Sequence, residues 1–230
     1  MTLNSGQPRR QRGHVTLVLA MMSGAAVLTL PHSEAAATCF GEVATSADHE
    51  DDIQGTPGDD VLIGDGGVNT INGNGGSDRM CGGGGDDYIS TSGDFSGATV
   101  YANGGSGDDT IQGADNDDRL YGGDGNDTLL GLDGGDELHG EGGDDSIQGG
   151  AGPDFMEGGD GKDHLIGGND RDDMRGGPKA DRLEGDDGDD ELHGEGGGDT
   201  LIGGPGDDEF IGGPGKDICA QEAGGIAFPC

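Results

Sequence analysis

Aspartate recurs every nine residues through most of this sequence, and its spacing is the strongest chemical signal in the chain. In nine-residue units cut from Gly55, the sixth position is Asp in 16 of 17 units, and Asn69 is the exception. Carboxylates are ligands that hard divalent cations such as Ca2+ prefer. We therefore interpret these residues as metal ligands. They are Asp60, Asp78, Asp87, Asp109, Asp118, Asp127, Asp136, Asp145, Asp154, Asp163, Asp172, Asp181, Asp190, Asp199, Asp208 and Asp217.

Glycine shapes the part of each unit that presents the carboxylate. It holds the first position of all 17 units and the fourth position of 14. Glycine adopts positive φ readily and lets the backbone pass close to a bound ion. The first six positions of each unit therefore predict a turn that offers one carboxylate and several backbone carbonyls. Calcium takes six to eight such oxygen ligands.

The last three positions of each unit predict a short strand. The eighth position is apolar in all 17 units, and its neighbours are polar or mixed. Because side chains alternate along a strand, the eighth residue points inward and the seventh and ninth point outward. One inward side chain per nine residues makes a thin core that cannot offset the entropy of ordering the chain. We therefore expect folding to require the cation.

Composition excludes several other classes of protein. The chain has 230 residues, of which 55 are Gly, with 29% hydrophobic residues and a formal net charge of −36. Such a chain would be repelled by nucleic-acid phosphates and by anionic membrane surfaces. Composition alone favours a disordered acidic polymer, but a disordered polymer would not keep a nine-residue register.

The register resembles that of a known family. Gly122–Leu130 and Gly203–Ile211 match Gly-Gly-x-Gly-x-Asp-x-apolar-x at every position, which is the repeat of hemolysin-type (RTX) calcium-binding proteins. The resemblance implies an all-β fold, a parallel β-roll or right-handed β-solenoid, with two units per coil. It also implies multiple Ca2+ ions between the turns of units n and n+2, with up to two sites in the first block of repeats and eleven in the second.

The repeats fall into two blocks, residues 55–90 and 104–220. Residues 91–103 interrupt them, either as an insertion that separates two rolls or as a degenerate half-coil that keeps the stack continuous. Residues 38–54 form an N-terminal segment or cap, and residues 221–230 form a C-terminal tail or cap.

The first 37 residues are typical of a secretory signal peptide. Arg9, Arg10 and Arg12 precede an apolar run, Val15–Leu30, and small residues follow at Ala35–Ala37. The run has 16 residues, short of the roughly 20 that span a bilayer, which argues against a membrane anchor. We expect a secreted, extracellular protein, and association with the cell surface stays open.

Four cysteines indicate disulfides in an exported chain. Their order in the sequence favours the pairs Cys39–Cys81 and Cys219–Cys230 among the three possible pairings.

Some turns are expected to be weaker than the others. Asn69 replaces a carboxylate, and Asp170 and Lys179 replace the fourth glycine, where we expect a strained backbone. Asn116 also replaces the fourth glycine, but Asn tolerates positive φ better. We expect partial occupancy around the unit Gly176–Glu184.

Together these patterns predict a secreted, non-enzymatic protein whose partners are calcium ions, without nucleic-acid binding or membrane insertion. The chain has no His-Glu-x-x-His motif, and Gly104–Asp108 departs from Gly-x-Ser-x-Gly at its last position. A second hypothesis is a cell-surface or extracellular-matrix structural protein that self-associates in a calcium-dependent way.

Overall fold

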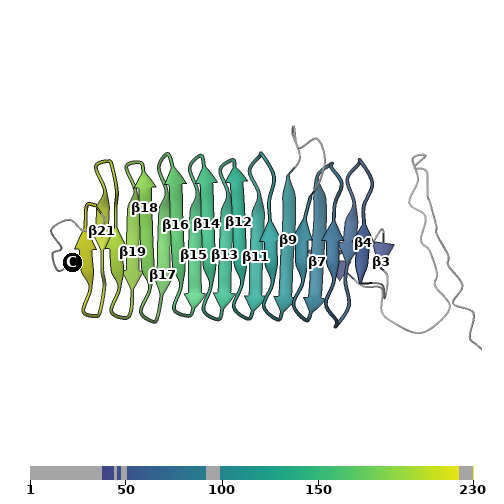
Figure 1. Cartoon of the computed structure of the whole chain (residues 1–230), viewed down its shortest axis with the longest axis horizontal. Coiled ribbons are helices and arrows are strands. Elements are labelled where there is room, and N and C mark those ends of the chain that lie inside the picture. Colours follow the sequence, from purple (N-terminus) through teal and green to yellow (C-terminus); the bar gives the residue numbers. More distant parts are fainter. Residues whose placement is uncertain (1–37, 44–45, 48–50, 92–98, 223–229) are drawn as a thin grey trace, which may run out of the picture. The chain divides into compact units, whose positions relative to one another are not determined.

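The computed structural model describes residues 38–43, 46–47, 51–91, 99–222 and 230. Every regular element in these ranges is a β-strand, and Figure 1 shows the strands stacked in sequence order from the blue N-terminal coils to the yellow C-terminal ones. Within the described ranges, no helix is long and apolar enough to cross a membrane. The segment expected to be a signal peptide lies outside the described residues.

The strands form two parallel sheets of ten strands each, which we name the odd-strand and even-strand sheets. The odd-strand sheet contains β3 (Ser46–Ala47), β5 (Val61–Ile63), β7 (Asp78–Gly84), β9 (Val100–Ser106), β11 (Arg119–Asp124), β13 (Glu137–Gly142), β15 (Phe155–Asp160), β17 (Asp173–Gly177), β19 (Glu191–Glu195) and β21 (Glu209–Ile211). The even-strand sheet contains β4 (Asp52–Gln54), β6 (Thr70–Asn72), β8 (Tyr88–Ser90), β10 (Thr110–Gln112), β12 (Thr128–Asp133), β14 (Ser146–Ala151), β16 (His164–Asn169), β18 (Arg182–Asp187), β20 (Thr200–Ile202) and β22 (Ile218–Ala220).

Each strand pairs in parallel with the strand two units further along the chain. Leu120 lies opposite Leu138, and Ile147 lies opposite Leu165, so the offset is 18 residues. Eighth-position side chains from both sheets meet in one core, where all but Phe210 are buried and Phe210 is partly buried. The predicted parallel β-roll with two units per coil is confirmed.

The interruption in the repeats is part of the same stack. Strand β9 pairs with β7 and β11, and Met80 lies opposite Ala102. On the other sheet, Ile89 lies opposite Ile111. The offset at this point is 22 residues instead of 18, so residues 100–103 act as a half-coil preceded by four extra residues. The two blocks therefore form one continuous roll, and residues 92–98 lie outside the described residues.

The N-terminal segment contributes more to the roll than the register indicated. Strand β3 pairs with β5, and β4 pairs with β6, where Ile53 lies opposite Ile71. Ile53 is buried in the core cluster. The stack therefore begins ahead of Gly55, in a segment whose sequence lacks the glycines of the repeat.

Both predicted disulfides are confirmed. Cys39–Cys81 joins the antiparallel hairpin of β1 (Thr38–Cys39) and β2 (Glu42–Val43) to β7. Cys219–Cys230 joins the last strand to the end of the chain. Most of the predicted C-terminal tail or cap, residues 223–229, lies outside the described residues.

The backbone of Leu132 is strained, so we expect glycine at this position to stabilise the roll. Leu132 has φ of 89°, whereas Gly150, its partner one coil on, has φ of 127°. Leucine in a left-handed conformation costs about 1–2 kcal/mol, which glycine avoids. We expect Leu132→Gly to raise the free energy of unfolding by about 1 kcal/mol, measured by denaturant titration in calcium. Leu130→Gly in the same strand is the control and should lower it. Equal destabilisation by both variants would contradict this account.

Candidate metal centre

One hydrogen bond repeats along both edges of the roll. In most turns, the backbone N–H at the sixth position donates to Oδ1 of the sixth-position Asp one coil further on, whereas Asp78 N donates to the carbonyl oxygen of Thr99. Asp127 N lies 2.8 Å from Asp145 Oδ1, for example. The turns that lead into the even strands form the even edge, with seven such Asp-to-Asp steps. The turns that lead into the odd strands form the odd edge, with six.

The predicted metal ligands are thereby sorted into two columns of eight. The even edge carries Asp87, Asp109, Asp127, Asp145, Asp163, Asp181, Asp199 and Asp217. The odd edge carries Asp60, Asp78, Asp118, Asp136, Asp154, Asp172, Asp190 and Asp208. Because the stack is continuous, the step from Asp87 to Asp109 crosses the interruption, which counting the two blocks separately had missed.

Most of these carboxylates are buried, and twelve of them have one oxygen without a hydrogen-bond donor. Thirteen of the sixteen are buried, and Asp60, Asp208 and Asp217 are half-buried. In the described part of the chain, twelve have a buried Oδ2 with no hydrogen-bond donor: Asp78, Asp87, Asp109, Asp127, Asp136, Asp145, Asp154, Asp163, Asp172, Asp181, Asp190 and Asp199. A buried carboxylate oxygen without a partner is costly. A cation at these positions would remove that cost.

Burial also changes the acidity of the carboxyl groups in the two columns of sixth-position aspartates, which we call the ladder. Removal from water raises the pKa of Asp172 to about 8 and the pKa of Asp154 to about 7, each against an ordinary value of 3.8. Neighbouring carboxylates raise the pKa of both further, whereas the backbone hydrogen bond lowers it. Near neutral pH, the metal-free ladder therefore resists ionisation, which a bound cation would favour.

The unpartnered oxygens share their space with backbone carbonyls. A Cβ on Gly140 would lie 2.3 Å from Asp145 Oδ2 and 2.5 Å from the carbonyl oxygen of Gly158, one coil on. The first glycine of the unit thus leaves room where a carboxylate and a carbonyl converge. No group of three or more His, Cys, Asp or Glu side chains in the described ranges is placed to hold a metal by itself. A cation here would need carbonyl ligands as well, as Ca2+ accepts.

In three turns, a backbone amide of the same turn donates to a side-chain oxygen of the sixth residue. In each, the amide of the second residue donates to the sixth-position side chain, and that second residue is not glycine and does not have positive φ. The pairs are Thr56 N with Asp60 Oδ2 (2.6 Å), Asp65 N with Asn69 Oδ1 (2.8 Å) and Ala114 N with Asp118 Oδ2 (2.6 Å). These turns have less need of a cation than the twelve above. A non-glycine second residue does not mark them in the sequence, because Leu132 and Glu141 hold the same position with positive φ in turns whose Oδ2 has no donor.

The turns with a substituted fourth glycine differ from one another. Asp170 has φ of 75°, so the predicted strain is present there. Lys179 and Asn116 do not have positive φ, and the prediction of strain at Lys179 is wrong. Their turns avoid the left-handed conformation at the fourth residue.

A second, exposed ladder at the fifth position was missed by sequence reasoning. Asp108 Oδ1 accepts from Asn126 N, and Asn126 Oδ1 accepts from Asp144 N, both at 2.8 Å. Asp144 Oδ1 accepts from Lys162 N at 3.0 Å. These side chains join coils without being buried, and Asp or Asn at the fifth position of alternate units is their sequence signal.

Comparison with known families agrees with this geometry. The model of the RTX calcium-binding nonapeptide repeat matches residues 50–89, 103–138, 130–165, 139–174, 166–201 and 193–220, which together cover more than half of the chain. Comparison with curated proteins finds no match.

Replacing a first-position glycine tests whether the space between the unpartnered Oδ2 and the backbone carbonyl oxygen must stay open for a cation. The methyl group of Gly140→Ala would meet both oxygens, so we expect it to weaken calcium binding and lower the free energy of unfolding in calcium by about 3 kcal/mol. Gly142→Ala is the matched control in the same turn, because its methyl would meet no atom closer than 3.7 Å. Differential scanning calorimetry at fixed calcium measures both variants. Equal melting temperatures for the two variants would contradict the steric account.

The raised pKa values of the sixth-position carboxyls predict that folding of the metal-free chain depends on pH. The folded pKa values of about 6 to about 8 lie above the unfolded values of about 4, so folding takes up protons. The contribution of these carboxyls to the stability of the metal-free roll is fully present below about pH 4 and is lost as pH rises through 6 to 8. We expect the chelated chain to gain strand signal in circular dichroism when pH falls from 8 to 5. Light scattering on the same samples guards against precipitation near the isoelectric point of about 4.1. A strand signal independent of pH would contradict the assignment.

Proposed function

The chain belongs to the family of RTX calcium-binding nonapeptide repeats, and from this premise we propose that it binds multiple calcium ions between its stacked turns and folds as it does so. The observation that carries the proposal is the set of twelve buried carboxylate oxygens without a donor. They lie along the two edges where the family's repeat has its turns. The sixteen sixth-position aspartates are the proposed ligands, together with carbonyl oxygens of the same turns.

Charge explains why the ion and the fold depend on each other. Each ladder stacks carboxylates one coil apart, and neighbouring carboxylates raise one another's pKa. Parallel strands lie only about 4.8 Å apart, so ionised neighbours repel strongly unless a cation lies among them. In the absence of calcium at neutral pH, this repulsion and the thin core favour the unfolded chain. Calcium would reverse that balance.

The proposal extends to location and to the absence of catalysis. Two disulfides support an oxidising compartment outside the cytoplasm, in keeping with the expected signal peptide. Among the described residues, the buried polar side chains are thirteen of the ladder aspartates with Asn69, Ser90 and Thr91. This set supports a role in ion binding rather than in bond-breaking chemistry.

Adjacent aspartates provide a charge-matched test of the ligands. Asp145 has a buried, unpartnered Oδ2, whereas the neighbouring Asp144 uses an exposed Oδ1 to accept from Lys162 N. Asn at position 144 keeps that acceptor. We expect Asp145→Asn to lower the number of bound ions by one or two, because its carboxylate borders two steps of the ladder. Asp144→Asn should keep the number found in the unsubstituted chain.

Native mass spectrometry with calcium chloride counts the ions bound to each variant directly. Equal loss in both variants would show that overall negative charge, and not ladder position, attracts the ions. A chain that binds no calcium at all would contradict the proposed function.

A further inference from the structure

Strand β9 is the weakest place in the calcium ladder. Val100 lies opposite Asp78 and occupies the sixth position on the odd edge, so no carboxylate stands between Asp78 and Asp118 there. Ala102 occupies the core position, which is Leu, Ile, Met, Phe or Cys in every repeat unit. This coil therefore lacks a metal ligand on one edge and much of its apolar core contact.

The outer face of β9 carries contacts that the repeats do not provide. The guanidinium groups of Arg79 and Arg119, on the two neighbouring strands, lie over the Tyr101 ring at 5.2 Å and 5.6 Å from its centre. The three residues are register partners, so they form one row across β7, β9 and β11. Such cation–π contacts join neighbouring strands without a metal.

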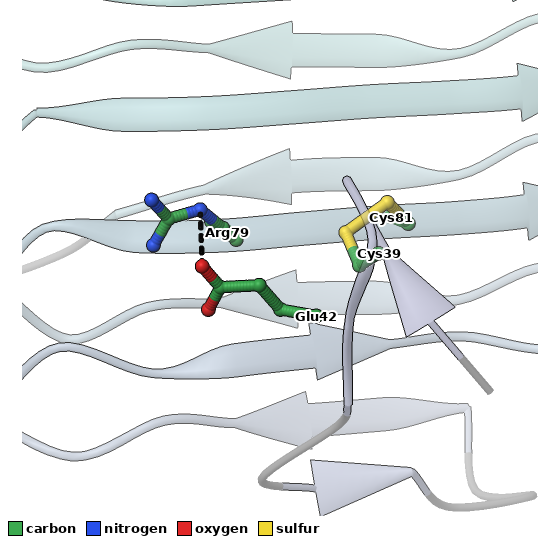
Figure 2. The surroundings of a disulfide bond; sticks show 4 residues. All are labelled: Cys39, Glu42, Arg79 and Cys81. Atoms are coloured by element: carbon green, nitrogen blue, oxygen red, sulfur yellow. Dashed lines mark ion pairs between the residues drawn. A yellow bond between two sulfur atoms is a disulfide. The ribbon is translucent and has the colours of Figure 1, made fainter. Parts of the chain in front are cut away.

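The N-terminal hairpin adds a second bridge over the same strands. Its Phe40 ring packs against Tyr101 and Tyr121, with ring centres 6.4 Å and 6.1 Å apart. Figure 2 shows Cys39 bonded to Cys81, and Glu42 turned towards Arg79 at 3.7 Å. Hairpin contacts thus reach β7, β9 and β11.

A small apolar cluster anchors the hairpin at its other end. Cys39 packs with Val61, Ile63 and Cys81 on the outer face of the roll. As a result, β5 is buried along all three of its residues, although the seventh and ninth positions of the repeat were expected to face outward. The hairpin therefore covers the first coils from outside, from β5, two strands before β9, to β11, one strand after it.

Three of the six described aromatic residues, Phe40, Tyr101 and Tyr121, lie in contact at this place. Phe40, Tyr101, Tyr121 and Phe155 lie on the outer face of the odd-strand sheet or against it, and only Tyr88 and Phe210 of those described lie elsewhere. Phe40, Tyr101 and Tyr121 thus lie outside the core at the coil that lacks its ligand, whereas Phe155 lies three strands further on, in β15.

We propose that the hairpin Thr38–Val43, its Cys39–Cys81 disulfide and the Arg79–Tyr101–Arg119 row form a metal-independent splint across β9. The splint couples residues 51–90 to the calcium-loaded roll that follows. Its formation depends on oxidation of the two cysteines, so the redox state of the compartment sets whether the first coils are stable. This role rests on the proposed calcium-dependent folding of the remainder.

Removing the tyrosine ring tests the splint. We expect Tyr101→Ala to lower the amide hydrogen-exchange protection of residues 51–90 about tenfold at saturating calcium chloride, and to leave residues 122–211 unchanged. Tyr88→Ala is the matched control, because Tyr88 is exposed on the even-strand sheet. It should leave both regions as they are.

The double variant Cys39→Ala with Cys81→Ala tests the disulfide by the same measurement. It should lower the hydrogen-exchange protection of residues 51–90 and leave that of residues 122–211 unchanged. Unchanged protection of residues 51–90 in both splint variants would overturn the proposal, as would an equal loss over the whole roll. These readings compare variants at one calcium concentration. They are therefore separate from failure of the proposed function, which would show in the unsubstituted chain as protection that does not depend on calcium.

Discussion

The hydrogen bond from a sixth-position amide to the carboxylate one coil further on is the contact on which the rest of this structure depends. It uses Oδ1 of each aspartate and fixes the height of one turn above the next. Because that oxygen is occupied by the backbone, Oδ2 is forced into the space between the turns, where twelve of these atoms meet no donor. The same contact that builds the stack therefore creates the demand for a cation.

This arrangement makes binding and folding a single process. The core is a single file of apolar side chains from each sheet, and the carboxylates beside it are buried. Neither half is favourable alone at neutral pH, because the core is small and ionising the buried carboxyls of the ladder is costly. Where the ladder loses a carboxylate, at Val100, the chain places aromatic and cationic side chains on the outside of the same coil. Such contacts between coils need no metal, as the exposed fifth-position ladder also shows.

Much of this could be predicted from the sequence because the repeat forces it. A nine-residue period with one inward residue leaves little choice of fold, and the order of the four cysteines favoured the observed pairs. The period carries no information where it stops, so β3 and β4 were missed, although Ile53 lies in the core. The internally paired oxygens of Asp60 and Asp118 depend on the φ of a neighbouring residue, which is set by packing between coils rather than by the motif.

Far-ultraviolet circular dichroism of the disulfide-intact chain at pH 7.5, first with a chelator and then with calcium chloride, tests the central claim most directly. The account predicts a largely unordered spectrum in chelator and a cooperative rise of strand signal as calcium is added. A chelated chain already rich in strand, and unchanged by calcium, would contradict it.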